Sequence, residues 1–279
     1  MPSRCSRRWT LPVPDAGTAP QRTVVVEPVM GTMVTVDVRD PQPMQQPALG
    51  AAIEAAIAWL HQVDATFSTY RDGSEVSRLG RGELLESECS PDVREVLGLC
   101  AEVERRSGGC FDIRRGGRLD PSGLVKGWSV QRAAELLRAA GARSFFIGAG
   151  GDIVTRGEAA PGERWRVGIR HPELADRVAA VLETGDLAVA TSGAYERGEH
   201  ILDPRTGRAP EGLLSMTVVG PSLTYADAFA TAAFVMGEQG LPWVMEIDGY
   251  EGLAITRDHR TVWTPGMARL LGRDIAPAM

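Results

Sequence analysis

The fold class of this chain is decided by residues 224–236, which read Thr-Tyr-Ala-Asp-Ala-Phe-Ala-Thr-Ala-Ala-Phe-Val-Met. It predicts one long helix in a half of the chain that otherwise predicts strands. Strands follow strands there, without the regular strand–helix–strand spacing of a doubly wound sheet, so the predicted class is α+β. The strands predicted around the helix are Trp165–Arg170, Val178–Glu183, Leu187–Thr191, Glu199–Leu202, Ser215–Val219, Leu253–Thr256 and Thr261–Trp263.

The N-terminal half predicts a mixture of both kinds of element. Residues 1–21 are rich in Pro and aperiodic, which predicts a disordered tail and leaves residues 22–279 as a single domain. Ser90 followed by Pro91 is a typical helix start, and Gly108 ends that helix. The other predicted elements are strands at Thr23–Glu27, Met33–Arg39 and Ser144–Ile147, and helices at Ala48–Phe67 and Lys126–Ala140.

Composition excludes several classes of function. The chain has 279 residues with 30 Lys+Arg against 36 Asp+Glu, a net charge of -6, and no basic block interleaved with aromatic residues, so we expect no nucleic-acid partner. No apolar stretch is long enough to span a membrane, and the first twenty residues lack an apolar signal core. The four cysteines form no C-x-x-C pair. We therefore expect a cytoplasmic protein with free thiols.

Asp227 and Thr231 lie four residues apart on the predicted helix, so their side chains share one face. A carboxylate and a hydroxyl are hard oxygen donors of the kind that Mg²⁺ prefers. The alternative is structural: an Asp near a helix start is stabilised by the macrodipole, and a Thr can bond back to a carbonyl. From these two residues alone, both interpretations stay open.

A second candidate is Leu119-Asp-Pro-Ser-Gly-Leu-Val-Lys-Gly127. Asp120 precedes a Pro-Ser-Gly turn, and Lys126 is the only lysine of the chain. We expect Lys126 to open a helix whose free N–H groups, together with the ammonium, could face a phosphate. The segment lacks the G-x-x-x-x-G-K-[ST] pattern of a Walker A loop, and a polar turn before a helix would look similar.

Two further segments are less specific. A dinucleotide-binding turn is suggested by residues 145–153, Phe-Phe-Ile-Gly-Ala-Gly-Gly-Asp-Ile. However, Ile153 stands where the motif requires a third glycine, and no helix is predicted to follow. We reject that interpretation and expect a close turn of the backbone. His200 precedes the Asp203-Pro204 turn, where it could simply be held by a hydrogen bond.

The order of these segments is more specific than any one of them. Between Val29 and Thr264 the chain resembles the FAD:protein FMN transferase (ApbE) family. The segments that carry the resemblance are Met30-Gly-Thr32, Phe67-Ser-Thr-Tyr70 with Ser74-Glu-Val-Ser77, Gly108-Gly-Cys-Phe-Asp112, Asp120 to Gly127, Gly148 to Asp152, Thr191-Ser-Gly193, His200 to Gly207, and Ala226-Asp227 with Thr231.

The resemblance implies a fold, a reaction and a set of site residues. The fold would be an α+β arrangement related to the T-fold, with FAD bound between two lobes. The reaction would be Mg²⁺-dependent transfer of FMN from FAD to a threonine hydroxyl of an acceptor flavoprotein, releasing AMP. Carried over by motif, Mg²⁺ would be held by Gly123, Asp227 and Thr231. FAD would contact Met30, Tyr70, Cys110, Phe111, Asp112, Asp120, Lys126, Ile201 and Ala230.

This reaction needs a group that accepts the threonine proton. We expect His200 in that role, because the unperturbed pKa of a histidine, near 6.5, suits a base at neutral pH; a purely positional role is the alternative. Two other functions would use the same pocket. One is an Mg²⁺-dependent FAD pyrophosphatase that gives FMN and AMP, and the other is a non-catalytic FAD-binding protein.

The chain departs from the usual family pattern in one region. Only Ile113–Leu119 separates Phe111-Asp112 from Asp120, where most members carry a longer insertion, and Pro121-Ser122 replaces the usual Leu-Gly. We expect these differences to affect how one end of FAD is enclosed.

Overall fold

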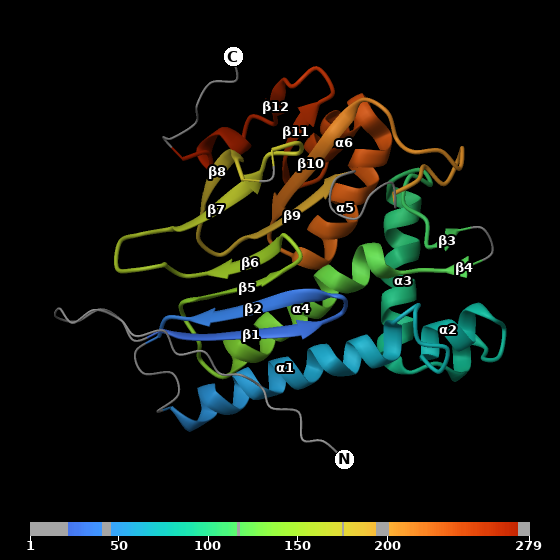
Figure 1. The fold of residues 1–279 in the computed structure, drawn as a ribbon, viewed down its shortest axis with the longest axis horizontal. Coiled ribbons are helices and arrows are strands. Elements are labelled where there is room, and N and C mark those ends of the chain that lie inside the picture. Colours follow the sequence, from blue (N-terminus) through green and yellow to red (C-terminus); the bar gives the residue numbers. More distant parts are fainter. Residues whose placement is uncertain (1–21, 41–45, 116–117, 175, 194–200, 273–279) are drawn as a thin grey trace.

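Eight strands form one antiparallel sheet in the order β1-β2-β5-β6-β9-β10-β11-β12 (Figure 1). This is seen in a computed structural model that describes residues 22–40, 46–115, 118–174, 176–193 and 201–272. The predicted tail at residues 1–21 lies outside the described residues. The strands are β1 Thr23–Val29, β2 Thr32–Val38, β5 Phe145–Ala149, β6 Asp152–Arg156, β9 Ala188–Gly193, β10 Leu213–Gly220, β11 Glu251–Thr256 and β12 Thr261–Trp263.

A two-residue turn joins β1 to β2. Met30 and Gly31 both have positive φ, 55° and 69°, while Val29 and Thr32 pair across the hairpin. Two successive residues with positive φ form the turn type that matches the twist of antiparallel strands. The turn also places Met30 at the edge of the sheet's helical side, where its side chain packs against the core.

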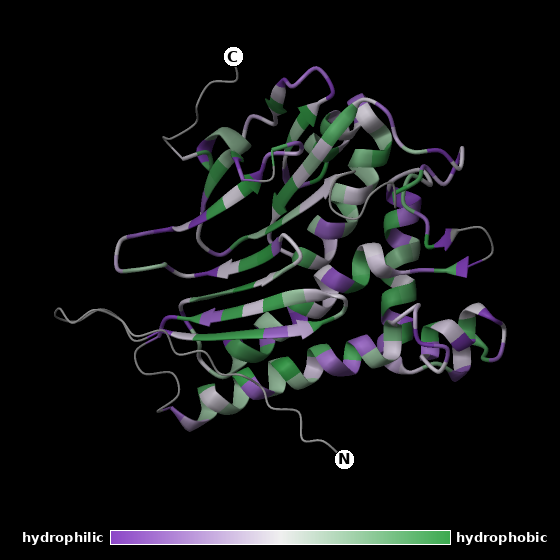
Figure 2. Cartoon of the chain, in the orientation of Figure 1, coloured by the Kyte–Doolittle hydropathy of each residue, from purple (hydrophilic) through white to green (hydrophobic). Residues whose placement is uncertain are grey.

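Helices cover one face of this sheet. In Figure 1, α4 (Ser122–Ala139) and α5 (Leu223–Met236) lie behind the strands, and α1 (Pro47–Phe67) packs against α4. Hydrophilic and hydrophobic residues alternate along α1 in Figure 2, which is typical of an amphipathic helix. The other α-helices of the described residues are α2 Glu75–Gly80, α3 Pro91–Arg106 and α6 Gly240–Met245.

A separate hairpin covers part of the opposite face. It consists of β7 (Trp165–Arg170) and β8 (Val178–Thr184). In β9, Ala188 and Ala190 belong to the core under the helices, whereas Val189 belongs to the smaller core under this hairpin. Successive side chains of a strand point to opposite faces, so the central strands are buried on both sides.

The predicted α+β class is confirmed, with corrections to individual elements. Helix α4 begins at Ser122, four residues before the predicted start at Lys126. The strand predicted at 199–202 is wrong for Ile201 and Leu202, which are irregular, and residues 199–200 lie outside the described residues. Helices α2 and α6, strand β6, and a short hairpin of β3 (Arg114–Arg115) and β4 (Arg118–Leu119) were not predicted.

The glycine turn after β5 agrees with the rejection of a dinucleotide-binding loop. Gly150 and Gly151 have φ of 55° and 94°, and the chain continues directly into β6 rather than into a helix. The described residues contain no helix long and apolar enough to cross a membrane.

Candidate active site

A cavity of about 840 Å³ lies where the helices meet the β1–β2 turn and the end of β9. Its volume is within the usual range for ligand-binding pockets. The predicted FAD and metal residues that line it are Met30, Tyr70, Cys110, Phe111, Asp112, Asp120, Gly123, Lys126, Ile201, Asp227 and Thr231. Ala230 is fully buried in α5 and does not border the cavity, while His200 lies outside the described residues.

The rim of the cavity includes the turn after α1. Tyr70 is 93% exposed there. The Ser68 carbonyl accepts hydrogen bonds from the hydroxyls of Ser74, at 2.7 Å, and Ser77, at 3.2 Å. Arg71 forms an ion pair with Asp64 of α1. The turn is therefore fixed at several points, while the Tyr70 ring stays accessible to a ligand.

The segment after α3 supplies two buried lining residues, Cys110 and Phe111. The Phe111 N–H donates to the Ser107 hydroxyl at 3.0 Å, which closes the loop directly after the helix. Burial raises the pKa of the Cys110 thiol, since the thiolate is poorly solvated there. This cysteine is therefore not an activated nucleophile.

The short connection between Asp112 and Asp120 is the β3–β4 hairpin. The Asp120 N–H donates to the Ile113 carbonyl at 2.7 Å, which closes the hairpin at its base. Asp112 and Asp120 both line the cavity, although seven residues separate them in the sequence. The short hairpin therefore brings both aspartates to the cavity.

Helix α4 directs its N-terminal turn toward the cavity. The Asp120 carboxylate accepts the Ser122 N–H at 3.1 Å, and Ser122 and Gly123 line the cavity. The prediction that Lys126 opens this helix is wrong, because Lys126 lies one turn further in. The Asp-Pro pair was the available signal, since Pro is favoured in the first turn of a helix and an acidic side chain satisfies its free N–H groups.

Asp227, Thr231 and Gly123 come together on one side of the cavity. The carboxylate of Asp227, 4% exposed, accepts the Gly127 N–H at 2.9 Å. In a regular helix the Gly127 N–H would donate to the Gly123 carbonyl oxygen. Asp227 therefore competes with the Gly123 carbonyl for this N–H. A Cβ built on Gly123 would lie 3.8 Å from the Thr231 hydroxyl. Gly123, Thr231 and Asp227 thus line the same cavity, and Gly123 is a close neighbour of the Thr231 hydroxyl.

Asp227 is not a helix-start residue. Helix α5 begins at Leu223, so Asp227 lies in its second turn, and the structural interpretation based on the helix start is wrong. Thr231 bonds through its hydroxyl to the Ser192 hydroxyl at 3.1 Å, which orients it toward β9. Among the described residues, no three His, Cys, Asp or Glu side chains form a metal-binding group, so any ion here would need carbonyl and hydroxyl oxygens as well.

Lys126 lies between two carboxylates. Its Nζ is 2.5 Å from Oδ2 of Asp152 and 3.6 Å from Oδ1 of Asp227. Asp152, fully buried at the start of β6, and Ser192 were not among the predicted site residues. Asp152 does belong to one of the segments that carry the family resemblance, Gly148 to Asp152, but its pairing with Lys126 depends on the fold.

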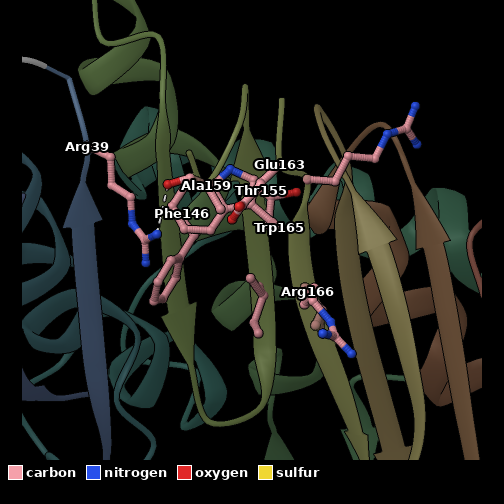
Figure 3. Close-up of a pocket in the computed structure, with 10 residues that line it drawn as sticks. Arg39, Phe146, Thr155, Ala159, Glu163, Trp165 and Arg166 are labelled. Atoms are coloured by element: carbon pink, nitrogen blue, oxygen red, sulfur yellow. Dashed lines mark hydrogen bonds between the residues drawn. The ribbon is translucent and has the colours of Figure 1, made fainter. Parts of the chain in front are cut away.

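A smaller cavity of about 320 Å³ lies on the other face of the sheet (Figure 3). The Arg39 guanidinium stacks 4.5 Å from the Trp165 ring centroid, donates to the Ala159 carbonyl at 2.8 Å and pairs with Asp37 at 3.1 Å. These contacts join the end of β2 to the loop before β7. Arg39 is therefore engaged within the protein.

The fold and the larger cavity define a mixed α+β protein that gathers hard oxygen donors beside a helix N-terminus. The sequence model of the ApbE family matches residues 30–117 and 113–254. The chain belongs to the ApbE family.

Relatives and solved structures agree with this assignment. A protein of Vibrio cholerae named FAD:protein FMN transferase is 37% identical over 131 residues, 43% of this chain and 39% of that protein. One of Rhodobacter capsulatus with the same name is 33% identical over 235 residues, 80% of this chain and 41% of that protein. The matched region thus spans about two fifths of the length of these relatives.

Two crystal structures share the fold. The flavin transferase ApbE from Vibrio cholerae superimposes with a TM-score of 0.76 at 24% identity, covering 90% of this chain and 99% of that one. The ApbE protein from Thermotoga maritima gives a TM-score of 0.79 at 22% identity, covering 91% and 100%.

Proposed function

We propose that this protein transfers FMN from FAD to a threonine hydroxyl of an acceptor flavoprotein and releases AMP, with Mg²⁺ as its metal. The observation that carries the proposal is the grouping of Gly123, Asp227 and Thr231 beside the N-terminus of α4, in a cavity of suitable size. The names of the relatives support the choice of reaction.

FAD would occupy the larger cavity, between the two lobes of a T-fold-related arrangement. Its pyrophosphate would lie at the first turn of α4, where free N–H groups and the helix dipole favour an anion. Lys126 and the metal would add positive charge close to it. The exposed ring of Tyr70 at the rim would contact one of the two aromatic ends of the dinucleotide.

The donor set fits Mg²⁺. Asp227 supplies one buried carboxylate, and Thr231 and Gly123 supply neutral oxygens, which is typical of an ion that keeps few protein ligands and completes its shell with phosphate oxygens and water. When bound there, Mg²⁺ would neutralise charge on the pyrophosphate and on the departing AMP.

The chain's own residues would then orient one displacement. The acceptor threonine oxygen forms a bond to the FMN phosphorus, the bond from that phosphorus to the bridging oxygen breaks, and AMP leaves with the electron pair. The threonine proton needs an acceptor, and we propose His200 for it. With His200→Ala, Mg²⁺-dependent FAD binding should persist while transfer slows about a hundredfold.

The test supplies FAD and Mg²⁺ with and without a flavoprotein domain whose threonine carries FMN, and follows AMP by chromatography and acceptor mass by spectrometry. The proposal predicts AMP release that requires the acceptor and a matching mass increase. AMP and free FMN formed equally without acceptor would instead show a pyrophosphatase. FAD binding without AMP under all conditions would show a non-catalytic flavin-binding protein.

A further inference from the structure

We infer that Asp152 is a positioning residue that holds the Lys126 ammonium away from Asp227 and so keeps the Asp227 carboxylate available to a divalent cation. The inference rests on the proposed function, because it concerns the cation site of that function. Asp152 does not border the cavity, so it would act through Lys126 rather than on a ligand.

The three residues come from three elements that meet at the centre of Figure 1. Asp152 starts β6, Lys126 lies in the second turn of α4, and Asp227 lies in the second turn of α5. The ammonium is 2.5 Å from the Asp152 carboxylate but 3.6 Å from that of Asp227. Lys126 is therefore paired tightly with the residue outside the cavity and loosely with the residue inside it.

The Asp152 carboxylate is fixed by the backbone around it. It is 0% exposed, and its Oδ1 accepts the Thr191 N–H of β9 at 3.2 Å. The turn before it uses Gly150 and Gly151 in left-handed conformations, which glycine adopts without a steric cost. Oδ2 lies 2.5 Å from the Lys126 Nζ, and the Thr191 N–H holds the other oxygen of the carboxylate.

The lysine side chain, in contrast, is only partly buried, with 20% of it exposed. Its ammonium is a compact charge on a flexible four-carbon chain. If the Asp152 charge were removed, the Lys126 ammonium would be attracted mainly to the Asp227 carboxylate. Because the attraction between opposite charges grows as their separation falls, we expect the ammonium to move closer to Asp227. A divalent cation would then have to displace Lys126 from its own ligand, so its affinity would fall.

The test measures Mn²⁺ binding by electron paramagnetic resonance in FAD-free protein, with Mg²⁺ as competitor, so activity is not the readout. Asp152→Asn keeps the side-chain shape and should weaken Mn²⁺ binding by about tenfold or more, the equivalent of one lost charge interaction of about 1.4 kcal/mol. Adding Lys126→Met to that variant should restore the affinity, because the competing ammonium is gone. Lys126→Met alone should bind Mn²⁺ at least as tightly as the wild type, which gives a second measurement if Asp152→Asn folds poorly.

Asp37→Asn is the matched control. Asp37 is also a buried carboxylate of the sheet, 4% exposed, paired with one cation, Arg39, at 3.1 Å. It lies away from the cavity, so its variant should lose a similar ion pair without a change in Mn²⁺ affinity.

Several results would overturn the inference. They are wild-type Mn²⁺ affinity in Asp152→Asn, no recovery in the double variant, or weaker Mn²⁺ binding in Lys126→Met alone. Failure of the proposed function would look different: the wild type itself would bind no Mn²⁺, or Asp227→Ala would bind it as well as the wild type. Either of those outcomes removes the cation site and overturns both proposals together.

Discussion

Asp227 combines two tasks in one carboxylate. Its Oδ2 accepts the Gly127 N–H at 2.9 Å, and the same group faces the cavity beside Thr231. A buried carboxylate is costly unless it is hydrogen-bonded or paired, and here the amide and Lys126 both stabilise it. Substitutions at this position must therefore separate loss of the charge from loss of the hydrogen bond.

Asp227→Asn makes that separation. The amide oxygen can still accept the Gly127 N–H, so we expect the Tm to change little. The charge that attracts Mg²⁺ is lost, so Mg²⁺-dependent AMP release should fall by about a hundredfold or more. Thr231→Ala should reduce the same rate more mildly, because a neutral hydroxyl is lost rather than a charge. Near-normal Mg²⁺-dependent activity in Asp227→Asn would contradict the metal assignment.

Lys126 is predicted to matter for FAD itself. Lys126 lines the cavity beside the N-terminal turn of α4. A charge-assisted hydrogen bond to a phosphate contributes more binding free energy than a neutral hydrogen bond, so Lys126→Ala should weaken FAD binding by about tenfold or more. Isothermal titration calorimetry with FAD measures this. Arg143→Ala is the control, because the Arg143 side chain is 82% exposed and lies outside the cavity lining. Equal effects of the two substitutions would show that Lys126 does not contact FAD.

How much of the site could be predicted differed from residue to residue. The pairing of Asp227 with Thr231 follows from helical spacing, which is local information. The pairing of Lys126 with Asp152 joins residues 26 positions apart on different elements, so no local spacing indicates it. Ala230 was assigned by motif, but it faces the core, and no part of the local sequence shows which side of an Ala-rich helix borders a cavity.

At the scale of elements, the contact between α4 and α5 sets the geometry of the site. A Cβ built on Gly127 would lie 2.4 Å from the Leu223 carbonyl oxygen and 2.7 Å from the Asp227 Cβ, distances that real Cβ atoms do not adopt. Gly127 thus permits the close approach that brings its N–H to the Asp227 carboxylate. The glycine, rather than helix propensity, decides how these two helices pack.

Gly127→Ala should therefore damage both stability and metal binding. Overpacking at such a contact costs about 1–3 kcal/mol, so the Tm should fall, and Mg²⁺-dependent activity should fall with it as Asp227 is displaced. Gly98→Ala is the matched control. Gly98 lies in α3 with nothing within 4 Å of its added Cβ, so the better helix propensity of Ala should leave the Tm unchanged or raise it. Thermal unfolding of both variants decides the point, and an unchanged Tm in Gly127→Ala would contradict the packing argument.

Element boundaries were harder to predict than element types. The start of α4 was placed at Lys126 because Pro-Ser-Gly at residues 121–123 was interpreted as a turn. In the structure Pro121 is instead the N-cap residue, Ser122 begins the helix, and the Asp120 carboxylate accepts the Ser122 N–H. The predicted strand over Ile201 and Leu202 failed for another reason. Apolar residues there line the cavity instead of pairing in a sheet, and hydropathy does not distinguish the two cases.

At the scale of the whole molecule, the sequence predicted the class but not the sheet order. The hairpins β1–β2, β5–β6 and β11–β12 connect neighbours in the chain, and such local pairs can be read from turns. The pairs β2–β5 and β6–β9 join segments separated by helices or by the β7–β8 hairpin. These pairings depend on which faces the helices cover, and that is a property of the assembled core.

The same assembly explains why many elements contribute to the larger cavity. Its wall combines the β1–β2 turn, the end of α1, the segment around Phe111, and residues of α4 and α5, so it extends beyond the group of oxygen donors in more than one direction. FMN would fill only the flavin part and one phosphate position. FAD would in addition place its second phosphate and its adenosine against the remaining wall.

We therefore expect FAD to bind more tightly than FMN, by about tenfold or more at equal Mg²⁺ concentration. The additional adenosine of FAD buries further surface away from water, and its second phosphate gains charge-assisted contacts at α4. Calorimetric titration with each flavin measures the difference directly. A parallel thermal-shift series checks it, since a ligand that binds only the folded state raises the Tm according to its concentration relative to Kd. Titration with AMP isolates the adenosine half of the cavity. If FMN and FAD bound equally and AMP did not bind, the cavity would accommodate the flavin half alone, and the transfer of FMN from a bound dinucleotide would lose its structural basis.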